Sequence, residues 1–151
     1  MASAAGGCTP APKALLAVER TDAGRARVLI APCPEYDALQ FSVSSSGGSV
    51  GHQRWALIND AMGGPLASVD LFSPPQGWSV TRSALSDLKG GREYTVKIDG
   101  AVRGRGLDGR LSFTPSQFDS LKPGRVIVTN GEDSKVIEKS EFMKKDAGRC
   151  A

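Results

Sequence analysis

The chain has 151 residues, of which 40% are hydrophobic and 23% charged, and 19 basic against 16 acidic residues give a net charge of +3. These values are typical of one globular domain and exclude a disordered polypeptide. The basic excess is small and scattered, which argues against a nucleic-acid partner. The sequence lacks an apolar run of about 18 residues, so we expect no segment to span a bilayer.

Glycine and proline are abundant, at 18 and 9 residues, whereas aromatic residues make up only 6% of the chain. This balance favours many short strands joined by tight turns over long helices. We therefore expect a mainly β fold, with residues 1–12 as a flexible N-terminal tether and residues 13–151 as a single β-sandwich domain.

Small residues and prolines surround Cys8 in the N-terminal segment AGGCTPAP, residues 5–12. This segment resembles the lipobox of bacterial lipoproteins, in which small residues precede a cysteine that becomes the lipidated first residue of the mature protein. The resemblance implies lipidation at Cys8 and attachment to the membrane through that lipid anchor only. The Arg- and Gly-rich composition would suit a high-GC, for example actinobacterial, genome.

Two features depart from the lipobox pattern. Ala5 stands where a larger aliphatic residue is usual, and Met1–Gly7 lacks the basic region and apolar stretch of a signal peptide. Either the preceding signal is missing from this sequence, or the start site lies elsewhere, or the match is a coincidence. An unpaired thiol is a liability in an exported protein, and lipidation would consume the thiol of Cys8.

Three cysteines, Cys8, Cys33 and Cys150, allow three possible pairs. We expect a disulfide between Cys33 and Cys150, because it would tie the C-terminus onto the body of the domain. For a closed loop on the order of 100 residues, chain entropy alone contributes roughly 4–5 kcal/mol. Such a bond favours an extracytoplasmic location, either at the cell surface or secreted. The alternative is three unrelated thiols in a cytosolic protein.

The first half of the domain predicts a series of strands. Residues 13–20 and 25–32 form a hairpin, with Gly24 available for a positive φ. Residues 38–44 alternate, placing Leu39, Phe41 and Val43 on one buried face. Further strands are expected around Trp55 and Leu57 and around Ala67, Val69 and Leu71.

The segment LKGGREYTVKI, Leu88–Ile98, is similar to the turn into strand F of fibronectin type III and related immunoglobulin-like domains. The resemblance implies a core leucine, Leu88, and a tyrosine, Tyr94, whose hydroxyl hydrogen-bonds back to the turn. Val96 stands where antibody-type domains place a disulfide cysteine, which fits the disulfide-free branch. We expect an immunoglobulin/fibronectin III-like β-sandwich.

The C-terminal part predicts a short helical extension. Thr114, Pro115 and Gln117 form a helix start, with a capping box and proline at the first helical position, and turn Phe118 and Leu121 inward. Asn130-Gly131 predicts a hairpin. Ser140 is expected to cap a short terminal helix carrying Phe142 and Met143, which brings Cys150 to its partner.

Gly104–Gly109 matches G-x-G-x-x-G, but a dinucleotide site needs a helix directly afterwards and a strand is predicted there instead. We expect no cofactor. The segment 100–110 is interpreted as an exposed loop that carries Arg103, Arg105 and Arg110. It is either a basic recognition loop or a glycine-rich hairpin kept soluble by its arginines.

His52, the only histidine, lies in the serine/glycine loop 44–53. One histidine builds neither a zinc site nor a catalytic triad without partners, so we expect no metal and no catalytic residue. We interpret His52 as part of a second candidate contact loop.

The sequence therefore predicts a non-enzymatic binding or structural module of the cell envelope, anchored through Cys8. It would contact a protein or envelope partner through loops 44–53 and 100–110, and we expect a monomer. One alternative is a secreted enzyme inhibitor or immunity-type protein, which tight stoichiometric inhibition of a hydrolase would reveal. A second is a divergent enzyme, whose turnover would be lost on replacing His52 by Ala.

Overall fold

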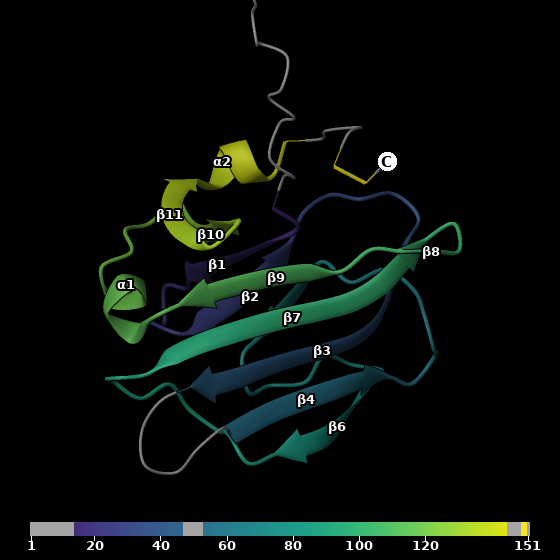
Figure 1. Cartoon of the computed structure of the whole chain (residues 1–151), viewed down its shortest axis with the longest axis horizontal. Coiled ribbons are helices and arrows are strands. Elements are labelled where there is room, and N and C mark those ends of the chain that lie inside the picture. The colour runs from purple at the N-terminus through teal and green to yellow at the C-terminus, as the bar shows by residue number, and fades with distance from the viewer. Residues whose placement is uncertain (1–13, 47–52, 145–148, 151) are drawn as a thin grey trace, which may run out of the picture.

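The computed structural model describes residues 14–46, 53–144, 149 and 150. In these ranges the chain is mainly β, with two antiparallel sheets and two short helices (Figure 1). The elements in chain order are β1 (Leu16–Arg20), β2 (Ala26–Ile30), β3 (Tyr36–Ser46), β4 (Gln53–Asn59), β5 (Ser68–Asp70), β6 (Trp78–Ser83), β7 (Glu93–Val102), β8 (Arg105–Gly106), β9 (Gly109–Phe113), α1 (Pro115–Asp119), β10 (Arg125–Asn130), β11 (Asp133–Glu138) and α2 (Lys139–Phe142).

The two sheets pack as a β-sandwich. The first has the strand order β11-β10-β1-β2-β5, and the second has the order β6-β4-β3-β7-β8, with β9 also paired to β7. Strand β3 is central in the second sheet and has 11 residues. The alternating residues that fill the space between the sheets are fully or almost fully buried; they include Leu16, Val18, Val28, Phe41, Val43, Tyr94, Val96, Ile98 and Leu111.

The predicted first hairpin is confirmed. β1 and β2 pair in register, with Leu16 opposite Ile30 and Val18 opposite Val28. Gly24 in the connecting turn has φ +79°, a left-handed conformation in which glycine is favoured because it has no Cβ. The two tryptophans, Trp55 and Trp78, are also buried, at 3% and 9% exposure.

One strand differs from the predicted alternation. Leu39 was expected beside Phe41 and Val43, but it is 36% exposed, whereas Ala38 is fully buried. The pairing of β3 with β7 shifts register between Ala38 and Gln40. This β-bulge inserts one extra residue and turns Leu39 to the outside. The sequence does not reveal the bulge, because a bulge depends on how two strands pair.

The turn before β7 has the hydrogen bonds that the resemblance implied. The hydroxyl of Tyr94 accepts from the backbone N–H of Lys89 at 2.6 Å and donates to the carbonyl of Lys89 at 3.3 Å. Leu88 is only partly buried, and the fully buried leucine of this turn is Leu85, at 2% exposure.

Helix α1 begins as predicted. The Thr114 hydroxyl accepts from the N–H of Gln117, and the Gln117 side chain accepts in return from the N–H of Thr114. Pro115 occupies the first turn, and Phe118 and Leu121 are each only 6% exposed. The capping box therefore fixes the helix where it closes one end of the sandwich.

The terminal helix starts earlier than predicted. α2 begins at Lys139 with Glu138 as its N-cap residue, and no side chain caps it, so Ser140 lies inside the helix. The N–H of Lys139 donates to the carbonyl of Gly124, so the pairing between the β10 and β11 segments extends to the first residue of the helix. Phe142 is buried as expected, at 2% exposure, but Met143 is 38% exposed.

Candidate functional site

Three chain connections meet at one end of the sandwich, which we call the loop end: residues 31–35, 60–67 and 103–104. Tyr36, the first residue of β3, pairs with Val102, the last residue of β7. The side-chain amide of Asn59 donates to the carbonyls of Ala38 and Gly63, at 2.9 and 3.0 Å. These bonds hold the connection after β4 against the start of β3.

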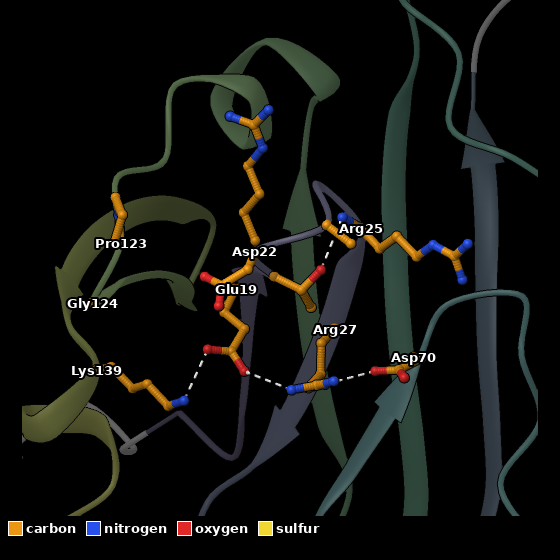
Figure 2. Close-up of a pocket in the computed structure, with 11 residues that line it drawn as sticks. Glu19, Asp22, Arg25, Arg27, Asp70, Pro123, Gly124 and Lys139 are labelled. Carbon is orange, nitrogen blue, oxygen red and sulfur yellow. Dashed lines mark hydrogen bonds and ion pairs between the residues drawn. The ribbon is translucent and has the colours of Figure 1, made fainter.

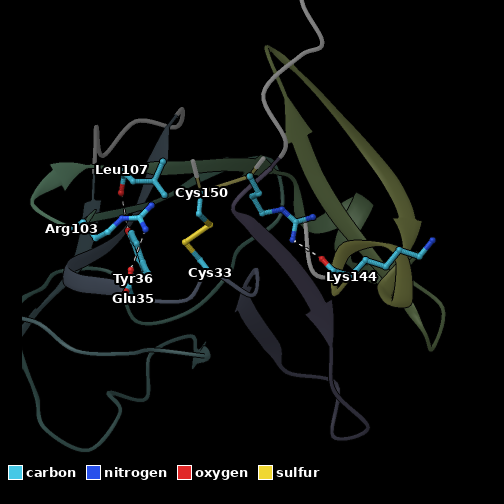
Figure 3. Close-up of a disulfide and its surroundings, with 8 residues drawn as sticks. Cys33, Glu35, Tyr36, Arg103, Leu107, Lys144 and Cys150 are labelled. Carbon is cyan, nitrogen blue, oxygen red and sulfur yellow. Dashed lines mark hydrogen bonds and ion pairs between the residues drawn. A yellow bond between two sulfur atoms is a disulfide. The ribbon is translucent and has the colours of Figure 1, made fainter. Parts of the chain in front are cut away.

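A disulfide fixes this end covalently. Cys33 and Cys150 are bonded, with their Cα atoms 5.8 Å apart, as the sequence predicted (Figure 3). The bond joins positions 117 residues apart and holds the C-terminus against the connection between β2 and β3. The neighbouring Arg149 guanidinium lies 5.5 Å from the centre of the Phe142 ring, and burial lowers the pKa of Arg149.

A shallow apolar cavity of about 480 Å³ adjoins the disulfide. Its walls come from the end of β2, the start of β3, the connection before β5 and the end of α2. The lining residues include Ile30, Cys33, Pro34, Tyr36, Leu66 and Met143. The C-terminal extension thus contributes to a surface that the strands alone would not make.

Tyr36 anchors the loop end from inside. Its ring is buried, at 5% exposure, and its hydroxyl donates to the carbonyl of Leu107 at 2.9 Å. A Cβ at Gly100 would lie 2.5 Å from the Tyr36 ring and from the backbone of Asp37. Burial raises the pKa of the Tyr36 hydroxyl well above its ordinary value, and the carboxylates of Asp108 and Asp99 raise it further. The phenol therefore stays neutral and donates its proton.

Arg103 lies in a two-residue turn between β7 and β8. Arg103 and Gly104 have φ of +50° and +79°, which matches the two left-handed positions of a type I′ hairpin turn. The Arg103 guanidinium lies 3.5 Å from the carboxylate of Glu35, whose own φ is +66°. Both side chains are more than half exposed, so the ion pair itself contributes little stability.

The three candidate arginines do not form one basic loop. Arg105 belongs to β8, directly after the turn, whereas Arg110 lies in β9 opposite Lys97 of β7. The segment 100–110 is thus mostly paired strand, so the expected exposed loop is wrong except for the turn at 103–104, and the alternative of a glycine-rich hairpin describes the backbone correctly. The loop end also carries acidic residues, Glu35 and Asp108 among them, so its charge is mixed.

Met62 adds an exposed apolar group to the same end. It is 79% exposed and has φ +58°, and its N–H donates to the carbonyl of Asn59 at 3.0 Å. Glu35, Met62 and Arg103 are three of the four described non-glycine residues with positive φ. Each such conformation costs on the order of 1 kcal/mol, and the surrounding contacts must impose it.

The second candidate contact loop, 44–53, is described only at its two ends. Residues 44–46 are the end of β3 and Gln53 is the first residue of β4, so these positions are paired strand and not loop as expected. The end of β3 lies eleven strand residues from its start, where the turn at Arg103 lies, a distance of roughly 35 Å at the rise of an extended strand. Residues 47–52, His52 among them, and Cys8 lie outside the described residues.

A second, charged groove of about 650 Å³ lies on the outer side of the first sheet (Figure 2). The carboxylate of Glu19 binds the Lys139 ammonium at 2.9 Å and lies 3.8 Å from Arg27, which in turn bonds Asp70 at 2.6 Å. The bond to Asp70 raises the pKa of Arg27. This row of alternating charges joins α2, β1, β2 and β5. The sequence did not predict it, because its members come from four separate elements.

Within the described ranges, no group of three or more His, Cys, Asp or Glu residues is placed to hold a metal ion. The same ranges contain no helix that is long and apolar enough to cross a membrane. Strand β9 begins at Gly109, the last glycine of the glycine-rich motif, so a strand and not a helix follows the motif, as the sequence predicted. The features that remain as a candidate site are the fixed backbone and exposed side chains of the loop end.

Comparisons with protein-family models, with curated proteins and with solved structures found no match for this chain.

Proposed function

We propose that this protein is a non-enzymatic binding module of the bacterial cell envelope, attached to the membrane by a lipid at Cys8, and that it contacts its partner through the loop end. The observation that carries this proposal is the way the loop end is built. A disulfide, a buried tyrosine and the Asn59 amide hold three connections in place. Glu35, Met62 and Arg103 have strained backbone conformations and exposed side chains, and these fixed connections hold them in place. Such an arrangement is typical of recognition sites.

We propose further that the sandwich is of the immunoglobulin/fibronectin III type. The neighbours β1-β2-β5 correspond to strands A-B-E of such folds, and β3-β7-β9 correspond to strands C-F-G. The Tyr94 bond to the turn before β7 supports the same assignment. In this alignment the loop end is the end at which variable domains of antibodies carry their binding loops. Strand β6, inserted between β5 and β7, is an addition to that plan.

The direction of the chain agrees with an anchor at Cys8. Leu15 accepts a hydrogen bond from the N–H of Ala31, so the first described residues enter the fold beside the end of β2, at the loop end. Five residues lie between Cys8 and Ala14, so the two positions are at most about 20 Å apart in a fully extended chain. A lipid at Cys8 would thus keep the loop end close to the membrane, which favours a partner at the membrane surface.

The side chains at the loop end indicate the chemistry of that partner. Arg103 and Glu35 offer opposite charges side by side, and Met62 offers an exposed thioether. Methionine adapts its shape to a partner surface, and a mixed-charge rim gives specificity more than affinity. We propose a protein partner with a small apolar contact framed by polar groups, rather than a polyanion.

A photo-crosslinking amino acid at position 62 tests the proposed contact. The variant protein is incubated with envelope membranes from the producing cell and irradiated. A discrete covalent adduct is expected at position 62 and not at Lys122, an exposed residue beyond α1 at the opposite end. Adducts of equal yield at both positions, or at Lys122 alone, would show that the loop end is not the contact surface.

The anchor is tested separately by replacing Cys8. We expect C8S to move the protein from the membrane fraction to the soluble fraction of the producing cell, while crosslinking at position 62 to added membranes is retained. If C8S remains membrane-bound after a wash at high salt, the proposed lipidation is wrong.

A further inference from the structure

The second sheet brings together cations that are far apart in the sequence. Five of its strands lie side by side in the order β6-β4-β3-β7-β9 (Figure 1). Four exposed cations come from four of these strands: Arg54, Arg82, Lys97 and Arg110. The small and scattered basic excess of the sequence gives no sign of this clustering, because strand pairing produces it.

Strand register aligns three of these cations in one line across the sheet. Ser42 of β3 pairs with Ala56 of β4 on one side and with Lys97 of β7 on the other. Ala56 pairs in turn with Arg82 of β6, and Lys97 pairs with Arg110 of β9. Residues directly opposite each other share one face of a sheet, and both chain neighbours of Ser42 are core residues. The line therefore lies on the outer face, and we call these five residues the basic row.

The basic row has long cationic side chains at its two ends and small residues at its centre. Four steps between neighbouring strands make it about 19 Å long. Ser42 and Ala56 are only 6% and 7% exposed, and both line a shallow depression of about 220 Å³. Arg54, Arg82 and Asp99 also line this depression. The centre of the row is thus hollowed, with cationic groups beside the hollow.

The fold does not neutralise these charges. In the described parts of the chain, none of Arg54, Arg82, Lys97 and Arg110 forms an ion pair. Lys97 and Arg110 lie directly opposite each other, and like charges in such a pair destabilise a sheet. The arrangement therefore costs stability in the free protein, and an anionic ligand would remove that cost.

We propose that the basic row binds a linear polyanion, a chain bearing phosphate or carboxylate groups, which lies across the strands. A guanidinium group donates two parallel hydrogen bonds to either anion. A chain that contacts several cations also releases several counterions, so it binds far more tightly than a single anion. In the envelope location proposed above, such a chain would be an anionic glycan. This source depends on the proposed function, whereas the binding itself does not.

The position of the row favours a polymer over lipid headgroups. Ser42 lies six residues beyond Tyr36, the start of β3 at the loop end, a distance of up to about 20 Å. If Cys8 holds the loop end near the membrane, the row stands away from the headgroups. A polymer that extends outside the membrane could still reach it.

Binding of the full chain with C8S to soluble probes tests the proposal without a contribution from a lipid anchor. The probes are long-chain inorganic polyphosphate, polygalacturonate, inorganic phosphate and phosphatidylglycerol vesicles, followed by calorimetric titration at several salt concentrations. We expect binding to at least one of the two polymers and far weaker binding to inorganic phosphate. The slope of log K against log salt should lie between about −2 and −3, since three or four cations each contribute roughly 0.7.

Single charge-removing variants in the C8S chain locate the site. K97T and R110T should each weaken polymer binding several-fold and make the salt slope less steep by about 0.7. D99N should strengthen binding, because it removes a carboxylate from the depression. K135T is the matched control, since Lys135 is an exposed strand residue of the first sheet, and it should bind like the parent chain. The thermal midpoint of K97T should not fall, because the variant relieves repulsion with Arg110.

Three results would overturn the proposal. The first is no binding to either polymer, and the second is an equal loss of binding in K97T and K135T, which would reflect net charge alone. The third is binding to the vesicles at least as tight as to the polymers, with the same loss in K97T and R110T. Met62 lies outside the basic row, so crosslinking at position 62 can succeed or fail independently of these results.

Discussion

The two ends of the sandwich are closed by a buried tyrosine in different ways. At the loop end Tyr36 donates across the fold to Leu107, 71 residues away. At the other end Tyr94 exchanges two hydrogen bonds with Lys89, five residues away. The first tyrosine joins distant segments, whereas the second tightens a local turn. A disulfide reinforces only the loop end.

This difference shows which end of the fold depends on covalent stabilisation by the disulfide. The opposite end is closed by local features, a tyrosine turn and a capped helix, which form from neighbouring residues. The loop end depends on contacts between segments that are far apart in the chain and carry strained conformations. Closing such long loops costs chain entropy, and a covalent bond offsets that cost.

Removing the disulfide should have the largest effect. The double variant C33S/C150S should lose about 4–5 kcal/mol of the free energy of unfolding, because the bond closes a 117-residue loop. Urea unfolding measures the loss. Hydrogen exchange should rise at residues 31–36 and 103–107 before it rises at 85–94. Equal loosening of both ends would contradict the comparison.

Gly100→Ala should be the next most destabilising change. The new methyl carbon would overlap the Tyr36 ring and the Asp37 carbonyl, and such overpacking costs about 1–3 kcal/mol. Gly106→Ala is the matched control, because Gly106 lies in the next strand, β8, and a Cβ there meets nothing within 4 Å. The thermal midpoint should fall for G100A and stay near wild type for G106A. The reverse order would show that Tyr36 does not pack on β7 as described.

Tyr94→Phe tests the opposite end. It removes both hydrogen bonds to Lys89 and should cost about 1.5 kcal/mol. Urea unfolding should show this loss with an unchanged slope, and the loop-end amides should keep their hydrogen-exchange protection. Loosening of the loop end in this variant would mean that the two ends are coupled rather than independent.

Tyr36→Phe should cost about 1 kcal/mol at neutral pH, and it should also change the response to alkali. The folded-state pKa of Tyr36 is raised by burial and by Asp108 and Asp99, so the unfolded chain loses this proton first, near the ordinary pKa of about 10. The stability of the wild type is therefore fully present below that pH and falls as the pH rises above it. Urea unfolding between pH 8 and 11 should show a smaller fall in the free energy of unfolding for Y36F than for the wild type. Parallel curves for the two proteins would show that ionisation of Tyr36 does not cause the alkaline loss of stability.

Local features of the fold could be predicted from the sequence. Thr114, Pro115 and Gln117 specify the start of α1 within one turn, and Gly24 specifies the first hairpin, because neighbouring residues decide these structures. The pair Cys33–Cys150 followed from the position of three cysteines along the chain. Each of these predictions depends on a few residues that are close together, or on a choice among only three cysteine pairs.

Features set by strand pairing could not be predicted. The bulge at Ala38 and Gln40 turns Leu39 outward, and only the register of β3 against β7 reveals it. The same holds for the charge row from Lys139 to Asp70. The turn at Arg103 lies within the segment predicted as a loop over 100–110, but its position and its contact with Glu35 come from tertiary structure.

The central claim is that the domain is exported, anchored by a lipid at Cys8, and stabilised at its loop end by a disulfide. Its most direct test is the intact mass of the unreduced protein isolated from membranes of the producing cell, followed by thiol alkylation and peptide mapping. We expect a linked Cys33–Cys150 peptide, no alkylated thiol, and added lipid mass on the peptide that contains Cys8. Three alkylated thiols and no added mass would contradict it, because the protein would then be neither oxidised nor anchored.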